Sequence, residues 1–102
     1  MKQVEQRIAQ LTDVEELNRI GSKYASSGNH IVAMKAFLRA AELGDTKCRP
    51  KIANIFLSRC WSYGNEDYRK AADLIKRWRE EGDEEVEYTL DLQTRLWSVL
   101  IQ

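Results

Sequence analysis

Side chains that could perform chemistry are few in this chain of 102 residues. His30 is the only histidine, and Cys48 and Cys60 are the only cysteines. General acid–base catalysis needs an oriented partner for the catalytic side chain, and the sequence shows no such pair for His30. The spacing of the cysteines matches no short metal-binding motif, and no glycine-rich phosphate loop occurs. We therefore predict that the protein is not an enzyme and that it holds no cofactor and no metal ion.

Charged side chains are the second feature with chemical meaning. Basic and acidic residues number 16 each, so the formal net charge is zero. A neutral chain has no global field that would attract nucleic acid or a membrane. The charges are nevertheless segregated. Residues 46–79 hold nine basic and three acidic residues, whereas residues 80–91 hold seven acidic residues and no basic one.

Aromatic residues interrupt the basic segment, which contains Trp61, Tyr63, Tyr68 and Trp78. Basic side chains that alternate with aromatic ones are typical of surfaces that bind nucleic acid. Most of these basic residues, however, fall at helix positions that face water. We therefore expect a local basic surface that attracts an acidic protein partner. A small helical regulator that binds or mimics nucleic acid is the alternative.

The elements that must position these residues are helical. Glycine is sparse, Pro50 is the single proline, and Ala, Leu, Glu, Lys and Arg dominate. This composition predicts an all-α fold, and the length fits one domain. The sequence shows neither a signal peptide nor a membrane-spanning segment. The lack of both segments, together with two cysteines that we expect to be buried thiols, favours a cytoplasmic protein without membrane contact.

Apolar periodicity and turn residues predict six helices. Thr12 and Glu15 have the spacing of a capping box, and Gly28, Gly44 and Gly82 have the position of helix stops. Trp78 and Trp97 fall on apolar stripes and are expected in the core. The expected helices cover residues 2–11, 13–27, 30–43, 50–61, 66–81 and 84–101.

An internal repeat is visible in the sequence. The segment AAELGD at 40–45 recurs 38 positions later as WREEGD at 78–83. In the preceding helices the equivalent offset is 32, which relates Gly21 to Ala53 and Tyr24 to Phe56. The second unit therefore has a longer loop, which falls in SRCWSYGNED.

The spacing Leu17-x-x-Ile20-Gly21-x-x-Tyr24 followed by Ala33-x-x-x-Phe37-x-x-Ala40 resembles the tetratricopeptide repeat. The ending AAELGD is similar to the related Sel-one-like repeat. The resemblance implies a short right-handed α-α superhelix in which small residues let the helices approach and aromatic residues fill the space between them. Its parts would be a cap helix at 1–12, a first repeat at 13–45, a second repeat at 46–83 and a C-terminal cap helix at 84–102.

The same resemblance implies a protein–protein interaction module, namely an adaptor, a small chaperone-like holder or an inhibitor. Partners of such repeats bind the concave face, and some members clamp a carboxylate there with Lys, Asn and Arg. The longer loop at 58–66 adds exposed aromatics beside a basic residue, which favours a binding hot spot. The expected partner-binding residues are Asn18, Arg19, Ser22, Lys51, Asn54 and Ser58 on the face, and Arg59, Trp61 and Tyr63 in the loop.

Two further possibilities remain open. The chain could be an accessory subunit that completes the active site of another protein. It could also form a homodimer through the C-terminal helix, whose apolar residues include Trp97, Leu100 and Ile101. Two repeats are few for a stable stack. A second copy that covers an exposed end would take the place of a further repeat.

Overall fold

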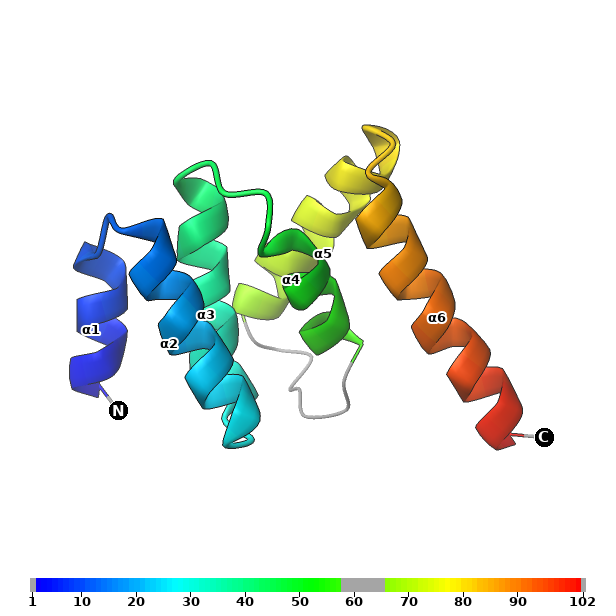
Figure 1. The fold of residues 1–102 in the computed structure, drawn as a ribbon, viewed down its shortest axis with the longest axis horizontal. Coiled ribbons are helices and arrows are strands. Elements are labelled where there is room, and N and C mark those ends of the chain that lie inside the picture. Colours follow the sequence, from blue (N-terminus) through cyan, green and yellow to red (C-terminus); the bar gives the residue numbers. More distant parts are fainter. Residues whose placement is uncertain (1, 58–65, 102) are drawn as a thin grey trace.

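The computed structural model describes the backbone of residues 2–57 and 66–101, and the side chains of residues 3–57 and 66–92. The described residues form α-helices and no strand, so the prediction of an all-α fold is confirmed (Figure 1). The helices, in chain order, are α1 (Lys2–Gln10), α2 (Val14–Ser26), α3 (His30–Glu42), α4 (Arg49–Phe56), α5 (Glu66–Glu80) and α6 (Glu84–Ile101).

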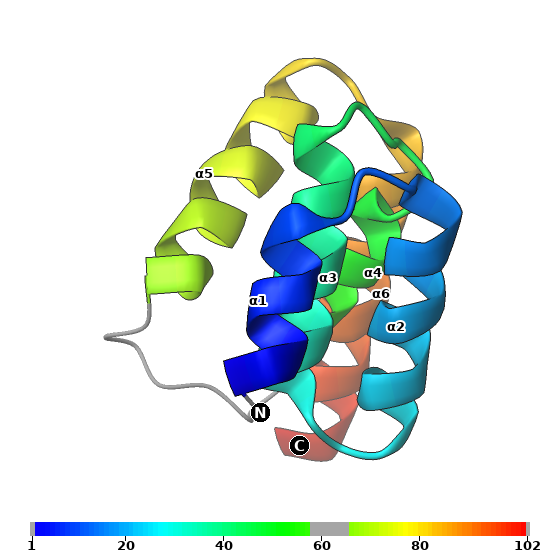
Figure 2. The same cartoon turned by 90° about the vertical axis from the view of Figure 1, so that its left-hand side faces the viewer.

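The helices form a two-layered stack along the longest axis of the molecule, with α1 and α6 at opposite ends (Figure 1). Seen end on, α2, α4 and α6 lie on one side, and α1, α3 and α5 lie on the other (Figure 2). Helix α3 packs against α1, α2, α4 and α5, while α4 also packs against α5 and α6. The core therefore runs through the centre of the stack.

Glycines end three of the helices as the sequence predicted. Gly44 and Gly82 have φ angles of 98° and 83°, a backbone region that is costly for residues with a Cβ atom. After each glycine an aspartate amide bonds to the carbonyl oxygen five residues earlier. The distances are 3.1 Å from Asp45 to Ala40 and 3.0 Å from Asp83 to Trp78. These bonds satisfy carbonyls that the helix would otherwise leave unpaired.

Aspartates then stabilise the turn before α4 and the first turn of α6. The Asp45 carboxylate accepts a hydrogen bond from the amide of Cys48 at 3.1 Å, and the Asp83 carboxylate accepts one from Val86 at 3.1 Å. Asp13 caps α2, where its carboxylate accepts from the amides of Glu15 and Glu16. The expected capping box at Thr12 and Glu15 is thus wrong by one residue. Asp13 has the extended backbone that a cap requires, and a carboxylate accepts more strongly than a hydroxyl at this positive helix end.

Helices α2 and α3 pack closely through small residues. Gly21 faces the ring of Phe37, and a Cβ atom at Gly21 would lie 2.5 Å from that ring. Ala33, Ala40 and Phe37 are buried in α3, so the predicted close-packing face is confirmed. Ile31, whose apolar side chain has the spacing of a residue that flanks this face, is 45% exposed. Val32 and Ala33 in the same first turn of α3 are buried, so Ile31 lies on the side of that turn that its neighbours leave uncovered.

Helix α4 is shorter than expected. It begins at Arg49, with Pro50 in its first turn, and ends at Phe56, with Leu57 as its C-cap. The predicted continuation to Trp61 lies outside the described residues. Cys48, Ile52, Ala53 and Ile55 are buried between α3, α5 and α6, and Trp78 of α5 is also buried, as predicted. The side chain of Trp97 lies outside the described part of α6.

Candidate interaction face between α2 and α4

Polar residues predicted to bind a partner line one shallow groove between α2 and α4. Ser22 and Ser26 stand one turn apart on α2, and Lys51 and Asn54 stand three residues apart on α4. Because residues at these spacings share one face of a helix, the two pairs point to the same side of the stack. The groove has a volume of about 250 Å³. Its lining is Ser22, Ala25, Ser26, Phe37, Lys51, Asn54 and Ile55.

The floor of this groove is apolar and its rim is polar. Phe37, which is 1% exposed, forms part of the floor together with Ala25 and Ile55. The ammonium of Lys51 lies 5.5 Å from the centre of the Phe37 ring. Among the described residues no carboxylate forms an ion pair with Lys51. A cation above an apolar floor is therefore available to an acidic ligand.

Asn18, another of the predicted partner-binding residues, makes hydrogen bonds within the stack. Its side-chain amide donates to the carbonyl oxygen of Val14 and to the carboxylate of Asp45, both at 3.0 Å. It thus joins the start of α2 to the turn that follows α3. Asn18 Oδ1 is buried and has no hydrogen-bond partner among the described groups. We assign Asn18 to the stack itself rather than to the groove.

Arg19 stands apart from the groove. Arg19 is exposed and forms an ion pair with Glu16 at 2.8 Å, so its guanidinium is held near the N-terminal end of the stack. The other four predicted partner-binding residues, Ser58, Arg59, Trp61 and Tyr63, lie outside the described residues. Only Ser22, Lys51 and Asn54 of the predicted set converge in the described structure.

The turn between α3 and α4 has a distinct electrostatic environment. Burial raises the pKa of the Asp45 carboxyl, but hydrogen bonds from Asn18, Lys47 and Cys48 outweigh that effect, and the pKa lies below its ordinary value. Burial, together with the nearby Asp45 carboxylate, raises the pKa of the Cys48 thiol to about 12. Cys48 is therefore a protonated core residue, and the chemistry of a thiolate is absent at this position.

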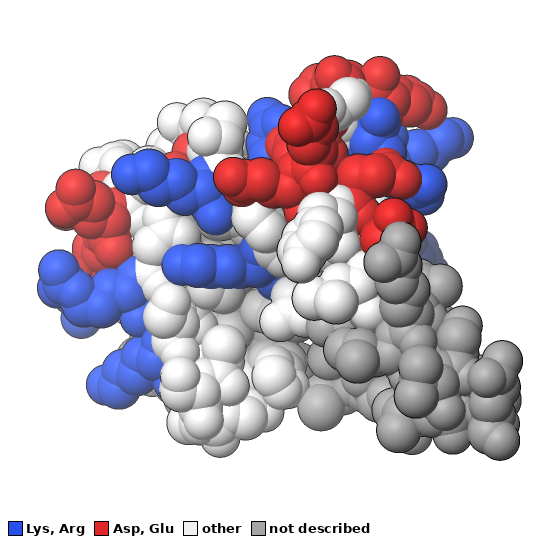
Figure 3. Space-filling model, turned by 45° about the vertical axis from the view of Figure 1, so that its right-hand side comes forward, with Lys and Arg blue, Asp and Glu red and all other residues white. Residues whose placement is uncertain are grey.

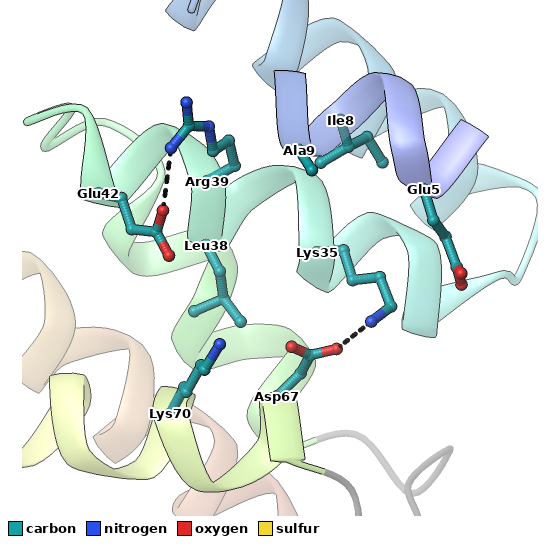
Figure 4. Close-up of a pocket in the computed structure, with 9 residues that line it drawn as sticks. All are labelled: Glu5, Ile8, Ala9, Lys35, Leu38, Arg39, Glu42, Asp67 and Lys70. Carbon is teal, nitrogen blue, oxygen red and sulfur yellow. Dashed lines mark hydrogen bonds and ion pairs between the residues drawn. The ribbon is translucent and has the colours of Figure 1, made fainter. Parts of the chain in front are cut away.

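A second groove, which sequence reasoning missed, lies between α1, α3 and α5 (Figure 4). It has a volume of about 230 Å³ and contains both signs of charge. The Lys35 ammonium and the Asp67 carboxylate form an ion pair at 2.7 Å, and this hydrogen bond raises the pKa of Lys35. Arg39 bonds to the carbonyl oxygen of Leu11 and to Glu42, each at 3.2 Å.

The charges of this second groove are largely satisfied by one another. Lys35 and Asp67 join α3 to α5, and Arg39 joins α3 to the end of α1, so these side chains hold helices together. The sequence contained no signal for these pairs because the partners lie far apart along the chain. The groove between α2 and α4, with its available lysine, is the stronger candidate for binding.

The described basic residues of the segment 46–79 do not all share one environment. Arg49 is half-buried, where its guanidinium pairs with Asp83 at 3.1 Å and lies 4.9 Å from the centre of the Trp78 ring. On α5 the exposed basic side chains alternate with Asp73 and Glu80, so positive charge is interrupted there. The exposed basic residues of α5 are Arg69, Lys70, Lys76, Arg77 and Arg79.

The described residues contain no candidate metal site and no candidate membrane span. No three His, Cys, Asp or Glu side chains within that part of the chain are grouped so that they could hold a metal ion. None of the helices, over the residues described, has the length and apolar character needed to cross a bilayer. Comparison of the chain with protein-family models, curated proteins and solved structures found no match.

Proposed function

We propose that this chain is a protein–protein interaction module that binds a segment of another protein in the groove between α2 and α4. The observation that carries the proposal is the convergence of Ser22, Lys51 and Asn54 above the apolar floor formed around Phe37. Binding sites commonly combine an apolar surface with a few polar groups that fix orientation. The resemblance to tetratricopeptide and Sel-one-like repeats supports the same kind of function, as an adaptor, a chaperone-like holder or an inhibitor.

The chemistry of the groove indicates what the partner segment carries. Lys51 would bond to a carboxylate, and charge-assisted bonds of this kind are stronger than neutral ones. The serine hydroxyls and the Asn54 amide would bond to the backbone of an extended segment. An apolar side chain of the partner would cover Ala25, Phe37 and Ile55. Because Lys51 is exposed, salt would weaken the ionic part of this binding.

The proposal is tested by comparing two lysine substitutions that change the charge equally. Lys51→Glu reverses the charge in the groove, whereas Lys47→Glu reverses an exposed charge outside it. We expect proteins captured from the native source by the wild type to be lost with Lys51→Glu and retained with Lys47→Glu. Capture that is unaffected by Lys51→Glu, or equally impaired by both substitutions, would contradict a site in this groove.

A second experiment examines the predicted carboxylate of the partner. The captured partner is mapped to a short segment, and each acidic residue of that segment is replaced by its amide. We expect one replacement to weaken binding to the wild type about tenfold and to have little effect with Lys51→Glu, because the two charges act as a pair. A nucleic-acid regulator would instead bind through the basic residues of α5 and would be insensitive to Lys51→Glu.

The remaining sequence predictions belong to this proposal. Trp61 and Tyr63, with Ser58 and Arg59, would extend the binding surface beyond the groove, and their replacement by alanine is expected to lower partner affinity. A binding protein of this kind needs no cofactor and no catalytic residue. A cytoplasmic location is part of the same proposal.

A further inference from the structure

Phe37 of α3 connects the packing of the stack to the groove between α2 and α4. Its side chain is 1% exposed, and its ring forms part of the groove floor. One edge of the ring faces α2, where a Cβ atom at Gly21 would lie 2.5 Å from Cε1, 2.6 Å from Cζ and 2.9 Å from Cδ1. The ring therefore occupies the space that a side chain at position 21 would fill.

Lys51 of α4 lies over the same ring. Its ammonium is 5.5 Å from the ring centre, within the distance of about 6 Å at which the negative face of an aromatic ring attracts a cation. No carboxylate of the described residues forms an ion pair with Lys51. Figure 3 shows mostly uncharged side chains over α2 and α4, with acidic ones gathered around the turn between α5 and α6 and at the left edge. The ring of Phe37 is thus the group that holds this ammonium.

Two other cations lie over aromatic rings in the described part of the chain, and their surroundings differ from those of Lys51. Arg49 lies 4.9 Å from the centre of the Trp78 ring, but an ion pair at 3.1 Å also holds it. Lys23 lies 6.0 Å from the ring centre of its neighbour Tyr24 and does not line the groove. Within the described residues, only Lys51 combines a buried ring beneath it with a place in the groove.

The position of this ammonium matters for binding. A surface lysine samples many rotamers, and an ion pair with a ligand normally costs the entropy of fixing one of them. A ring beneath the ammonium favours the rotamers that place the charge over the groove floor. Part of the ordering cost then falls on folding, and such preorganisation raises affinity for a ligand.

We propose that Phe37 is a positioning residue for Lys51, and that Gly21 determines where the ring, and with it the charge, is placed. The inference rests on the proposed function, because it describes how the groove holds its cation for an acidic segment. It also concerns the protein without a ligand, so it can be tested separately from partner binding. Packing between α2 and α3 would thus determine the position of a charge on α4.

The first test measures the position of Lys51 in the free protein by NMR. Hydrogens over an aromatic ring resonate upfield of those in an exposed lysine, for which Lys47 is the reference. We expect an upfield shift of the Lys51 Cε hydrogens that vanishes in Phe37→Leu, which keeps an apolar floor but removes the ring. Tyr24→Leu removes the ring beneath Lys23 and is expected to leave the Lys51 shift unchanged. Equal Lys51 shifts in the wild type and Phe37→Leu would overturn the proposal.

The second test separates the charge distribution of the ring from its shape. Pentafluorophenylalanine at position 37 keeps a ring of similar shape but removes the negative face that attracts a cation. We expect the Lys51 hydrogens to lose most of their upfield shift in this protein. The control is the same replacement of Phe56, which stacks on Tyr68 and does not line the groove. An unchanged Lys51 shift with the fluorinated ring at position 37 contradicts a positioning role for Phe37.

The third test concerns Gly21. Gly21→Ala forces the ring to move but changes no side chain that lines the groove. We expect its Lys51 shift to differ from that of the wild type, whereas Glu15→Ala, an exposed substitution in the same helix, leaves the shift in place. A Lys51 shift that Gly21→Ala does not alter would remove Gly21 from the proposal. Circular dichroism of each variant verifies that its helices are intact.

Binding is then measured with a probe that carries one apolar side chain and one carboxylate, the acetylated and amidated dipeptide leucyl-glutamate. We expect pentafluorophenylalanine at position 37 to weaken its binding about two- to fivefold. Equal affinity of the wild type and this variant would overturn the positioning role. A probe that does not bind the wild type would contradict the proposed function instead, while the expected Lys51 shifts would still support the positioning by Phe37.

Discussion

Gly21 lies against the ring of Phe37 with no room for a side chain. A methyl group there would approach the ring to 2.5 Å, and Phe37 is too deeply buried to move freely. Alanine favours helix over glycine by about 1 kcal/mol, whereas overpacking a core costs about 1–3 kcal/mol. We expect Gly21→Ala to lower the free energy of unfolding by up to about 2 kcal/mol, as measured by urea denaturation.

Ser22→Ala is the control for this substitution. Ser22 is the next residue of α2 and is exposed, so alanine there changes helix propensity without a clash. Its free energy of unfolding is expected to stay within about 0.5 kcal/mol of the wild type. A Gly21→Ala protein that is as stable as Ser22→Ala would contradict the close approach of α2 and α3.

Asp45 is a second residue on which local stability depends. Its carboxylate bonds to Asn18 and to the amide of Cys48, and its pKa lies below the ordinary value. A lowered folded-state pKa stabilises the fold above the unfolded-state pKa, and that contribution disappears as the pH falls through the lowered value. We expect Asp45→Ala to cost about 1–2 kcal/mol at neutral pH and progressively less in acid.

Denaturation of the wild type and Asp45→Ala at several pH values measures this difference. Asp73→Ala, which removes an exposed carboxylate, is expected to change stability by no more than about 0.5 kcal/mol. A difference between wild type and Asp45→Ala that does not shrink in acid would show that the charge of Asp45 contributes nothing.

At the scale of elements, Arg49 connects α4 to the turn between α5 and α6. Its guanidinium pairs with Asp83 at 3.1 Å and lies over Trp78. A planar guanidinium can pair with a carboxylate and stack on an aromatic ring at the same time, so lysine is a poor substitute. We expect Arg49→Ala to lower the free energy of unfolding by about 1–3 kcal/mol, and Arg49→Lys to recover only part of that loss.

Thermal denaturation followed by circular dichroism compares these variants, with Lys47→Ala as the control for loss of a nearby exposed charge. Equal stability of Arg49→Lys and the wild type would mean that charge alone, without the stacking on Trp78, accounts for the contribution of Arg49.

The helices were largely predictable because their signals are local. Neighbouring residues alone determine the apolar spacing within each helix. They also determine the helix ends at Gly28, Gly44 and Gly82. The cap of α2 was misplaced because Thr12 and Asp13 are adjacent and both can accept a hydrogen bond. Ile31 has the spacing of a packed residue, but whether a position is covered depends on helices that come later in the chain.

Contacts between distant elements were less predictable. The sequence placed Ser22, Lys51 and Asn54 on one face, and the structure brings them to one groove. Asn18 was expected on the same face, but its pairing with Asp45 could be seen only once the turn after α3 was placed beside α2. The ion pair of Lys35 with Asp67 depends likewise on how α5 packs against α3.

At the scale of the whole molecule, one continuous core joins the two ends of the stack. Buried residues extend from Ile8 of α1 to Val86 of α6 without separating into two clusters. We therefore expect damage at either end to destabilise the entire fold. Ile8→Ala should cost about 2–4 kcal/mol and Val86→Ala about 1–3 kcal/mol.

Tryptophan fluorescence and circular dichroism are expected to report the same unfolding midpoint for both variants, since small single domains unfold cooperatively. Separate midpoints for the two signals would show that the ends of the stack unfold independently. Thr46→Ala, a replacement of an exposed residue, is the control and should leave the midpoint unchanged.

Cys48 makes the junction of α3 and α4 accessible to kinetic measurement. Its thiol is fully buried and has a pKa of about 12, so a thiol reagent can modify it only when the junction opens. In a Cys60→Ser protein, the rate of modification would therefore record transient local opening, in the manner of hydrogen exchange. A ligand held in the groove between α2 and α4 would slow that rate, which gives a signal of binding without any added label on the partner.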